Sequence, residues 1–409
     1  MTEILYYEYP MVVSCTAKVV SCTAKDGAYL VALDRTPIFP EGGGQLPDRG
    51  SIVSGAGTAE ITDCHTVGGE ILHTCSAPFT PGEAVTVNLD VPRRLDHAEQ
   101  HTGEHVLSGL ASKLFGAVNV GFHMAEDYCT IDLDIELAPE QLVELELAAN
   151  RAVRADLPVH TEVTDGDDAS SRRLRKRAEK AQGEVRIVYI DNGKVDSCTC
   201  CGTHLPHTGM VGAIRITDSQ HYKGGTRLWF ACGGRASSAS VREHAALTAL
   251  ARQYSTSREE LPNAIRKQMD ELTAAKAELK AKSALLAAGT AAALVENAVK
   301  AGSVLITCEK LAGMNANDLK LVCDRLAESA KEPFAALVFA ENREGGTDYR
   351  MACSQGVKLS MKELCAAVNA AVNGKGGGSP LFAQGKTSRG VDAQTVDMLK
   401  SYMIKAIEG

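Results

Sequence analysis

The sequence changes character at Pro92-Arg93-Arg94-Leu95-Asp96-His97-Ala98-Glu99-Gln100-His101-Thr102-Gly103-Glu104-His105. Proline is favoured in the first turn of a helix, and apolar residues recur at helical spacing from this point to Phe115. These residues are Leu95, Val106, Leu107, Leu110 and Leu114. We therefore expect a helix over residues 93–115, which opens an α+β region.

Short strands precede this helix in residues 1–91. β-branched runs alternate there with turn signals, namely Asp26-Gly27, Pro47-Asp48, Gly68-Gly69 and Pro81-Gly82. Regularly spaced short strands predict a small β-barrel. Residues 12–25 contain Val-Val-Ser-Cys-Thr-Ala-Lys twice. Because seven is odd, the second copy would face the opposite side of a continuous strand, so we interpret it as a duplication within a hairpin and assign it no function.

Three further regions follow the barrel. Helices mixed with largely antiparallel strands predict an α/β two-layer domain over residues 92–238. Residues 239–295 have helical patterns only, and alternating strands and helices over residues 296–409 predict a separate small α/β domain. In the helical region Ile265, Leu272, Leu279 and Leu286 recur every seven residues. The alternate positions are weakly apolar, which favours a helical hairpin or a modest homodimer contact over a long zipper.

The composition is that of an ordinary globular protein. Hydrophobic residues make up 44% of the 409 residues and charged residues 23%, within the usual range. No apolar run approaches the roughly 18 residues that a membrane helix needs, so we expect no membrane association. The N-terminus lacks the basic and apolar regions of a secretory signal, so we expect a cytoplasmic protein whose 13 cysteines remain thiols.

Two short motifs predict a metal site. His101 and His105 lie four apart on the expected helix, so both imidazoles face nearly the same side. In Cys200-Cys201-Gly202-Thr203-His204 a glycine-containing turn could aim the thiol of Cys200 and the ring of His204 at one point. Three imidazoles and one thiolate are a ligand set typical of tetrahedral Zn²⁺. Either motif alone is weak, but the two together favour a metal site.

Neighbouring residues leave the ligand list open. His97 lies one turn before the first motif and is either a further ligand or part of a pocket wall. Cys198 and Cys201 are each alternatives to Cys200, which we choose because its spacing repeats that of the first motif. Glu104 points about 100° away and is either a surface residue or a support for the ligands. A closed structural zinc site is the alternative to an active one, although such sites usually have more thiolates.

With these motifs the sequence resembles the editing domain of alanyl-tRNA synthetase and the long form of the freestanding alanyl-tRNA editing proteins. The likeness extends to the glycine loop at residues 39–45, to residues 223–236, and to residues 374–385, which contain the glycine run and the seven residues after it. It implies deacylation in trans of tRNA(Ala) mischarged with serine, with glycine as a second candidate. A barrel in the first 91 residues leaves no room for an aminoacylating core.

The resemblance also implies roles for particular residues. Zn²⁺ would be held by His101, His105, Cys200 and His204, and would either activate water or position the substrate, with four protein ligands favouring positioning. The expected catalytic residues are Thr203 and Gly202 on the oxyanion side, with His97 in the pocket wall. The expected substrate-binding residues are Gln45, Gly43, Gly44, His123 and Thr130. A group that pairs with the serine hydroxyl would reject alanine.

Charge is unevenly distributed along the chain. Residues 1–150 hold 7 Lys+Arg against 22 Asp+Glu, whereas residues 151–409 hold 36 against 29. The second part could therefore supply a basic face for tRNA. We expect phosphate contacts from the densest basic run and from the glycine run, which either approaches a phosphate or forms a turn. The residues are Arg172, Arg173, Arg175, Lys176, Arg177, Lys180 and Lys375.

Two other functions remain open on the sequence. One is a zinc-dependent hydrolase of a small ester or peptide, with the last domain as a dimerisation module. The other is a non-catalytic RNA-binding protein whose zinc is structural.

Overall fold

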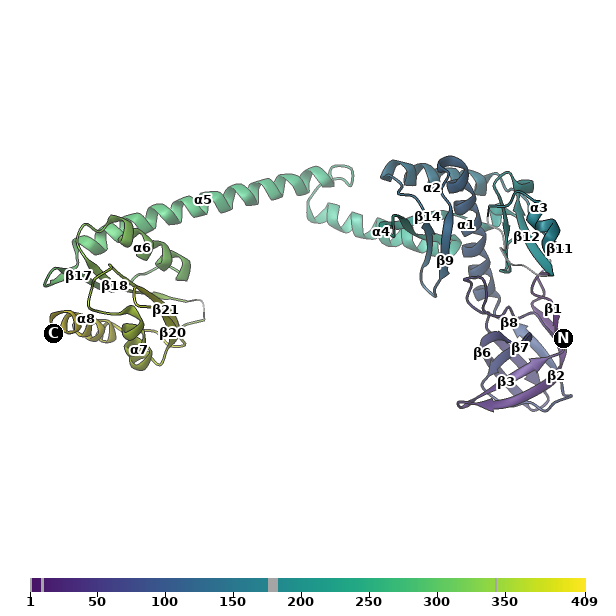
Figure 1. Ribbon diagram of the computed structural model, residues 1–409, viewed down its shortest axis with the longest axis horizontal. Helices are drawn as coiled ribbons and strands as arrows, with labels where there is room; N and C mark the ends of the chain where they lie inside the picture. Colours follow the sequence, from purple (N-terminus) through teal and green to yellow (C-terminus); the bar gives the residue numbers. More distant parts are fainter. Residues whose placement is uncertain (1, 9–10, 176–182, 343) are drawn as a thin grey trace. The chain divides into compact units, whose positions relative to one another are not determined.

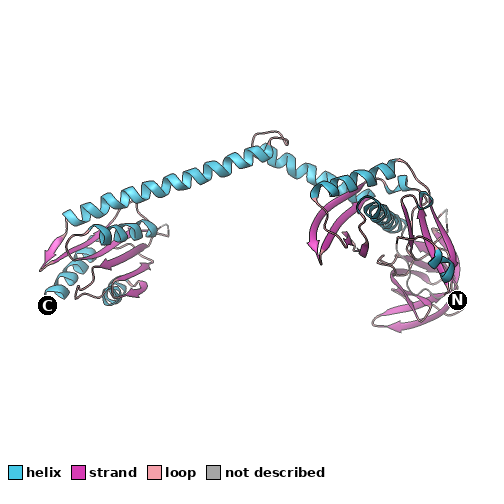
Figure 2. Ribbon diagram, turned by 45° about the horizontal axis from the view of Figure 1, so that its top comes forward, coloured by secondary structure: helices cyan, strands magenta, loops and turns pink. Residues whose placement is uncertain are grey.

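The computed structural model describes residues 2–8, 11–175, 183–342 and 344–409 (Figure 1). Helices and strands are mixed throughout, which confirms the predicted α+β class (Figure 2). The chain divides into two compact units, Met1–Leu250 and Ala251–Gly409. Within them we propose the four-part division at residues 1–91, 92–238, 239–295 and 296–409. No helix in the described ranges is long and apolar enough to cross a membrane.

Residues 14–89 form the predicted barrel. Its strands close in the order β2-β3-β7-β6-β5-β8 around a core that includes Val31, Leu33, Ile38, Ile52 and Val87. The strands are β2 (Ser14–Lys25), β3 (Ala28–Leu33), β5 (Gly50–Ser54), β6 (Gly57–Val67), β7 (Glu70–Cys75) and β8 (Ala84–Leu89), while the short β1 (Glu3–Ile4) pairs with β4 (Arg35–Thr36).

Residues 14–25 of the tandem heptapeptide form one continuous strand, β2, which is the first arm of a hairpin with β3. The register to β3 shifts between Val19 and Ser21, so that Val20 is an extra residue opposite no partner. The bulge takes one of the seven residues of the repeat out of the ladder, which leaves an even number of paired steps and restores the phase of the alternation. As a result Cys15 and Cys22, which occupy equivalent positions in the two copies, both pack against the barrel core.

The predicted helix is α1 (Val91–Phe115). The side chain of Asp90 caps it by accepting from Arg93 N at 3.1 Å, and Gly116 ends it in the left-handed conformation. Its middle turns are buried on every side, which brings polar side chains into the interior. Around it lie α2 (Pro139–Arg154) and a sheet ordered β14 (Ile214–Tyr222), β15 (Gly225–Cys232), β10 (Cys129–Leu133) and β9 (Asn119–Met124).

A second, smaller sheet completes this domain. Its order is β11 (Val159–Asp165), β12 (Glu184–Ile190) and β13 (Asp196–Thr199), with α3 (Gly166–Ser171) after β11. The chain leaves β13 directly into the segment that carries Cys200 and His204. The short helices η1 (Asp191–Gly193) and η2 (Thr208–Val211) flank these segments.

Two long helices follow, α4 (Gly233–Gln253) and α5 (Leu261–Glu296). They correspond to the helical patterns in the sequence. On α5 the heptad residues Leu272, Leu279 and Leu286 are exposed. In its last turns Ala287, Ala291 and Leu294 are buried in a core of the second unit, to which α5 itself belongs.

The second unit is a six-stranded sheet with helices on both faces. Its order is β16 (Val299–Ala301), β17 (Val304–Lys310), β18 (Phe334–Glu341), β19 (Thr347–Cys353), β21 (Phe382–Thr387) and β20 (Lys375–Ser379). One core holds residues of α7 (Met361–Val372) and α8 (Ala393–Glu408), and the other holds residues of α5 and α6 (Ala316–Ser329).

The glycine run lies in a strand, so the turn, one of the two alternatives that the sequence left open, is wrong. It forms β20, whose ladder partner among the described residues is β21. These strand positions require glycine for a steric reason. A Cβ at Gly376 would lie 2.5 Å from the buried hydroxyl of Tyr349, and one at Gly385 would lie 2.2 Å from it. Glycine therefore lets this hairpin approach the Tyr349 ring.

Candidate metal centre

Four side chains from two distant segments meet in the first unit. The ligand atoms of His101, His105, Cys200 and His204 all lie within 4.8 Å of one another. The Sγ atom of Cys200 is 3.3 Å from Nε2 of His101 and 3.4 Å from Nε2 of His204. Three imidazoles and a thiolate converging in this way fit the donor set of a zinc ion. The helix α1 supplies the first pair, and the turn after β13 supplies the second.

The protonation states of Cys200 and His204 suit metal binding. Burial raises the pKa of the Cys200 thiol, but the adjacent rings of His101 and His204 outweigh this effect and lower that pKa well below its usual value. Burial lowers the pKa of His204 to about 3, so its ring is neutral near pH 7. Thiolate and neutral imidazole are the forms that bind a metal ion. For His105 burial lowers the pKa, but Glu104, Asp196 and Cys200 outweigh it and raise that pKa well above its usual value, so a metal ion would have to displace a proton from this ring.

Gln45 links the barrel to this centre. Its Oε1 accepts from Nδ1 of His101 at 2.8 Å and from the backbone N of Thr203 at 3.0 Å, and its Nε2 donates to Thr203 Oγ1 at 2.9 Å. The glycine loop reaches this point because Gly44 packs on Phe122 of β9, where a Cβ would lie 2.9 Å from the ring. Gly43 has open space around it. Gln45 therefore holds a candidate ligand instead of facing a free pocket.

His105 is held from the other side by a carboxylate. Its Nδ1 lies 2.8 Å from Oδ2 of Asp196, which is 2% exposed. Burial raises the pKa of Asp196, but hydrogen bonds from His105 and Arg175 lower it to about 2. Glu104, which the sequence left as either a surface or a supporting residue, is buried and accepts from Ser108 Oγ and Asn119 Nδ2 at 2.6 Å each.

Two residues that sequence reasoning missed support the Cys200 turn. The Nη1 of Arg186 donates to the backbone carbonyls of Cys200 at 3.0 Å and Gly202 at 2.9 Å. The hydroxyl of Tyr7 donates to the carbonyl of Cys201, and the Arg186 guanidinium lies 4.1 Å from the centre of the Tyr7 ring. No local pattern marks these residues, because only the tertiary fold brings them to the turn.

The amides expected on the oxyanion side are already engaged. The backbone N of Gly202 donates to Sγ of Cys200 at 3.3 Å, and that of Thr203 donates to Gln45. Gly202 must also be glycine, because a Cβ would lie 2.0 Å from Cε1 of His101. These contacts argue against the expected oxyanion role and indicate a role in shaping the metal centre.

His97 is outside the group of four. Its side chain is fully buried, and neither ring nitrogen has a hydrogen-bond partner among the described residues. Burial, reinforced by Arg93, lowers the pKa of His97 to about 4, so the ring is neutral.

His123 and Thr130 do not face the centre. They are directly paired across β9 and β10, so they share one face of the sheet. Phe122 is on the other face, with its ring 5.1 Å from that of His101. Because neighbouring strand residues alternate between faces, His123 and Thr130 point away from the metal ligands. The sequence could not fix which face of this strand pair would meet α1.

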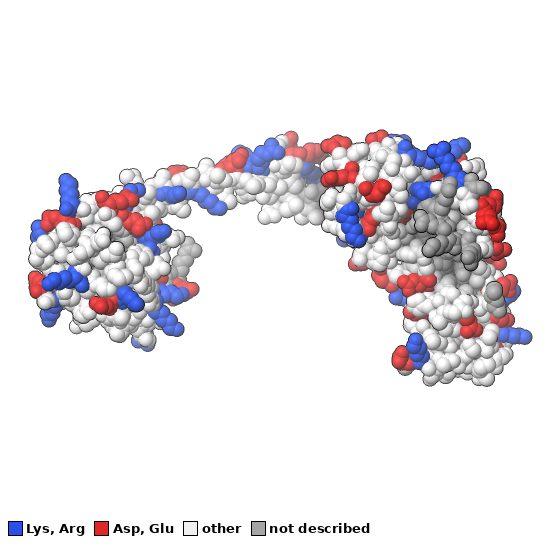
Figure 3. Space-filling model, viewed as in Figure 1, with Lys and Arg blue, Asp and Glu red and all other residues white. Residues whose placement is uncertain are grey.

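The expected tRNA contacts are in different environments. Arg172 is ion-paired with Glu162 and Asp168 at 2.6 Å each, and Arg175 is buried against Asp196. Arg173 is exposed, as is Lys375 on β20. The expected residues Lys176, Arg177 and Lys180 lie outside the described residues. Figure 3 shows lysine and arginine spread over the second unit among acidic side chains.

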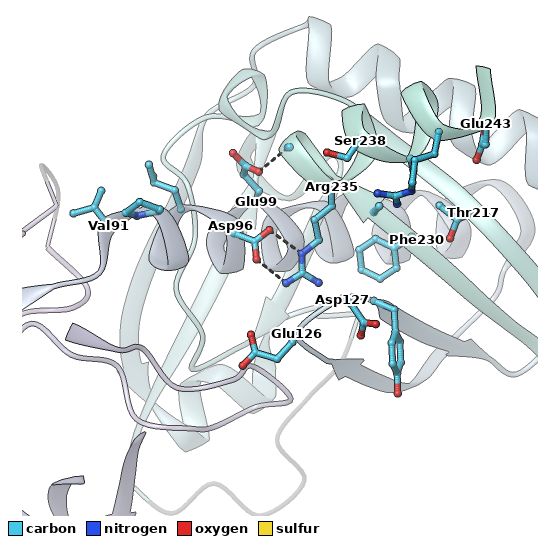
Figure 4. A pocket seen from close by; sticks show the side chains of 17 residues that line it. Val91, Asp96, Glu99, Glu126, Asp127, Thr217, Phe230, Arg235, Ser238 and Glu243 are labelled. Carbon is cyan, nitrogen blue, oxygen red and sulfur yellow. Dashed lines mark hydrogen bonds and ion pairs between the residues drawn. The ribbon is translucent and has the colours of Figure 1, made fainter. Parts of the chain in front are cut away.

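Two cavities lie near α1. A cavity of about 180 Å³ adjoins the centre and is lined by Thr203, His204, Tyr7 and Arg186 among others. A larger one, of about 980 Å³, has none of the four candidate ligands in its lining (Figure 4). Its wall carries the ion pair of Arg235 with Asp96, at 2.6 Å. The smaller cavity is therefore the one beside the chemistry.

Three family models match parts of the chain. The one described as tRNA synthetases class II (A) matches residues 2–93, the Threonyl and Alanyl tRNA synthetase second additional domain matches residues 185–229, and the DHHA1 domain matches residues 302–408. The barrel and the Cys200 turn each fall in one match, and the third match covers residues 302–408 of the second unit. Fold and site thus define a protein built from domains of the alanyl-tRNA synthetase type.

Full-length relatives narrow this class. Alanyl-tRNA editing protein AlaX-L of Pyrococcus horikoshii is 30% identical over 410 residues, which cover 94% of this chain and 95% of that protein. The chain belongs to this family of alanyl-tRNA editing proteins. Alanyl-tRNA editing protein Aarsd1 of Rattus norvegicus is 31% identical over 58% of each chain. An alanine–tRNA ligase of Halorubrum lacusprofundi is 28% identical over 97% of this chain, which spans only 43% of the ligase.

Proposed function

We propose that the protein is a trans-editing hydrolase that removes serine, and secondarily glycine, from mischarged tRNA(Ala) by hydrolysing the ester bond at a Zn²⁺ site. The observation that carries the proposal is the convergence of three imidazoles and one thiolate within 4.8 Å, next to a cavity. Membership of the alanyl-tRNA editing family supports the substrate class.

His101, His105, Cys200 and His204 would hold the ion. When bound, Zn²⁺ supplies a positive charge that either activates water or positions the substrate amino group or ribose. Four protein ligands fill a tetrahedral site, which favours positioning. The protein prepares this set because Gln45 and Asp196 each accept the Nδ1–H of a ligand histidine, which leaves Nε2 free for the ion.

His97 is our candidate for recognition of the serine hydroxyl. Because it is fully buried and lines neither cavity near α1, this role requires that the bound substrate open a path to its ring. A buried polar group without a partner costs about 1–3 kcal/mol, and a hydrogen bond from the substrate would recover part of this cost. Serine can form that bond and alanine cannot. A site that must pair with a hydroxyl can reject the analogue that lacks it by a factor of up to about 10⁴.

The tRNA body would contact basic side chains. Arg173 in the first unit and Lys375 in the second are exposed and available for phosphate. Exposed heptad leucines on α5 support a homodimer contact. The compartment we propose is the cytoplasm, where mischarged tRNA is encountered.

The deciding experiment is incubation of the purified protein with tRNA(Ala) charged with serine, glycine or alanine, followed by measurement of the released amino acid. We expect serine to be released fastest and alanine to be spared. The matched variant is His101→Ala, which should lose deacylation and zinc together while it keeps its fold. Equal turnover of all three charged tRNAs would contradict the proposal.

The two alternatives give different results in the same assay. A small-ester hydrolase would act on seryl esters without RNA as fast as on charged tRNA. A non-catalytic RNA-binding protein would release no amino acid, and its tRNA affinity would be unchanged in His101→Ala.

A further inference from the structure

We propose that Arg175 and Asp196 are positioning residues that fix His105 as a metal ligand, so that Arg175 serves the metal centre and not the tRNA. The inference rests on the proposed zinc site. It assigns to Arg175 a role opposite to the one that its place in the run suggests.

Asp196 controls the state of the His105 ring. Its Oδ2 lies 2.8 Å from Nδ1 of His105, and the aspartate is almost fully buried. A carboxylate at that distance accepts the Nδ1–H and therefore keeps the lone pair on Nε2, the nitrogen that faces Cys200 and His204. A carboxylate behind a ligand histidine also fixes the ring orientation and makes the ring a stronger donor to the metal.

Arg175 in turn fixes Asp196. Its Nε donates to Oδ1 at 2.7 Å and its Nη2 donates to Oδ2 at 3.0 Å, so the guanidinium binds both oxygens of the carboxylate. The backbone N of Arg175 donates to the carbonyl of Ser197 at 2.8 Å, which ties its own segment to β13. Only 8% of the Arg175 side chain is exposed. A buried carboxylate held by a two-pronged guanidinium cannot rotate away from His105.

Glu104 does not compete for this role. Its Oε1 accepts from Ser108 and Asn119 and is 3.9 Å from Nη2 of Arg175, beyond a good hydrogen bond. Its Oε2 lies 3.6 Å from Nε2 of His105, which is the other ring nitrogen from the one that Asp196 binds. Asp196 is therefore the principal partner of the guanidinium. Arg175 orients Asp196, and Asp196 in turn orients His105. This arrangement explains why one cation of the run is buried while its neighbour Arg173 is exposed.

The test compares the zinc affinity of four full-length variants with that of the unmodified protein, by competition with a chelator at fixed pH. Asp196→Asn and Arg175→Gln should each bind zinc roughly 10–100-fold more weakly. Arg175→Lys keeps the charge but lacks the fork, so its affinity should fall between these and that of the unmodified protein. Arg173→Gln is the matched control, and its zinc affinity should be unchanged.

The absorption spectrum of the Co²⁺-loaded protein supplies a second readout that a purely structural role would not move. We expect the visible bands to change in Arg175→Gln and Asp196→Asn and to stay the same in Arg173→Gln. Circular dichroism of the metal-free variants checks folding. If Arg175→Gln does not fold, Arg175→Lys decides the matter.

Folded variants at residues 175 and 196 with unmodified zinc affinity and an unmodified Co²⁺ spectrum would overturn this inference, while the deacylase proposal would stand. Failure of the unmodified protein to bind zinc would instead remove the proposed metal site itself. The two failures are therefore distinguishable.

Discussion

The amide oxygen of Gln45 lies 2.8 Å from Nδ1 of His101, although the two residues are 56 positions apart and belong to the barrel and to α1. Gln45 is 1% exposed, so this bond is sealed inside the first unit. A candidate metal ligand is thus oriented by a residue of another substructure. The barrel therefore takes part in building the site.

Replacing Gln45 with leucine should weaken zinc binding about 10-fold or more, because His101 loses the acceptor that fixes its ring. It should also lower the free energy of unfolding by about 1–3 kcal/mol, since the Thr203 amide loses its partner. Chelator competition and chemical denaturation measure the two effects. Glu41→Ala, at an exposed position of the same loop, is the control and should change neither. Unmodified zinc affinity in Gln45→Leu would refute the orienting role.

Gly202→Ala should abolish tight zinc binding and deacylation. Its Cβ would lie 2.0 Å from Cε1 of His101, so either the turn or the imidazole must move out of place. The matched substitution is Gly234→Ala, whose added methyl meets nothing within 4 Å and should leave zinc affinity as it is. Zinc content of the two purified variants distinguishes them. A Gly202→Ala protein that retains a full complement of zinc would contradict the geometry.

His97→Leu should separate stability from activity. Removing a buried, unpartnered imidazole should raise the free energy of unfolding by about 1 kcal/mol or more. If His97 recognises the serine hydroxyl, kcat/KM of the same variant on Ser-tRNA(Ala) should fall by at least about 10-fold, because the transition state loses the stabilisation of one hydrogen bond. His123→Leu, at an exposed position on the far side of β9, is the control. A stabilised His97→Leu variant with full activity would exclude the assignment.

The barrel should lose stability as the pH falls from about 6.5 to 4. Burial lowers the pKa of His73 to about 4, and its neutral ring is held by Val31 O at 3.0 Å and Thr36 Oγ1 at 2.8 Å. In the unfolded chain the pKa is about 6.5, so between these values the unfolded state binds a proton that the folded state does not. The free energy of unfolding should therefore fall by up to about 3 kcal/mol across this window.

Denaturation curves at pH 7, 6, 5 and 4 measure this slope. The His73→Asn variant lacks the titrating ring and should show a shallower decline, whatever its stability at pH 7. Parallel slopes in the two proteins would mean that His73 is not responsible.

Local patterns predicted the parts of this protein that depend on local spacing. Helical periodicity and Pro92 were enough to predict α1, and two motifs of spacing four were enough to bring four candidate ligands together. Strand parity did not suffice, because alternation places His123 and Thr130 on one face but does not say which face meets α1. Hydrophobic patterning also could not show that the exposed Arg173 and the buried Arg175 differ.

The supports of the site were beyond the sequence for a related reason. Tyr7, Arg186 and Asp196 act through contacts across 14 to 194 positions, and nothing in their neighbours marks them. The sequence left the glycine run as either a phosphate contact or a turn and did not predict a strand, because glycine usually weakens strands. Here the Tyr349 hydroxyl occupies the space that Cβ atoms would need, so the packing of this hairpin requires glycine.

The bulge at Val20 bears on how this chain can have grown. A strand that gains an odd number of residues normally inverts every side chain beyond the insertion and exposes its core. In β2 one residue, Val20, stays outside the ladder, so the side chains beyond it keep their faces. A doubled heptapeptide therefore fits a closed barrel whose strands can otherwise lengthen only by an even number of residues. Because the two copies are identical, excision of either one leaves the same chain, and we expect that chain to keep its alternation by losing the bulge together with six ladder positions.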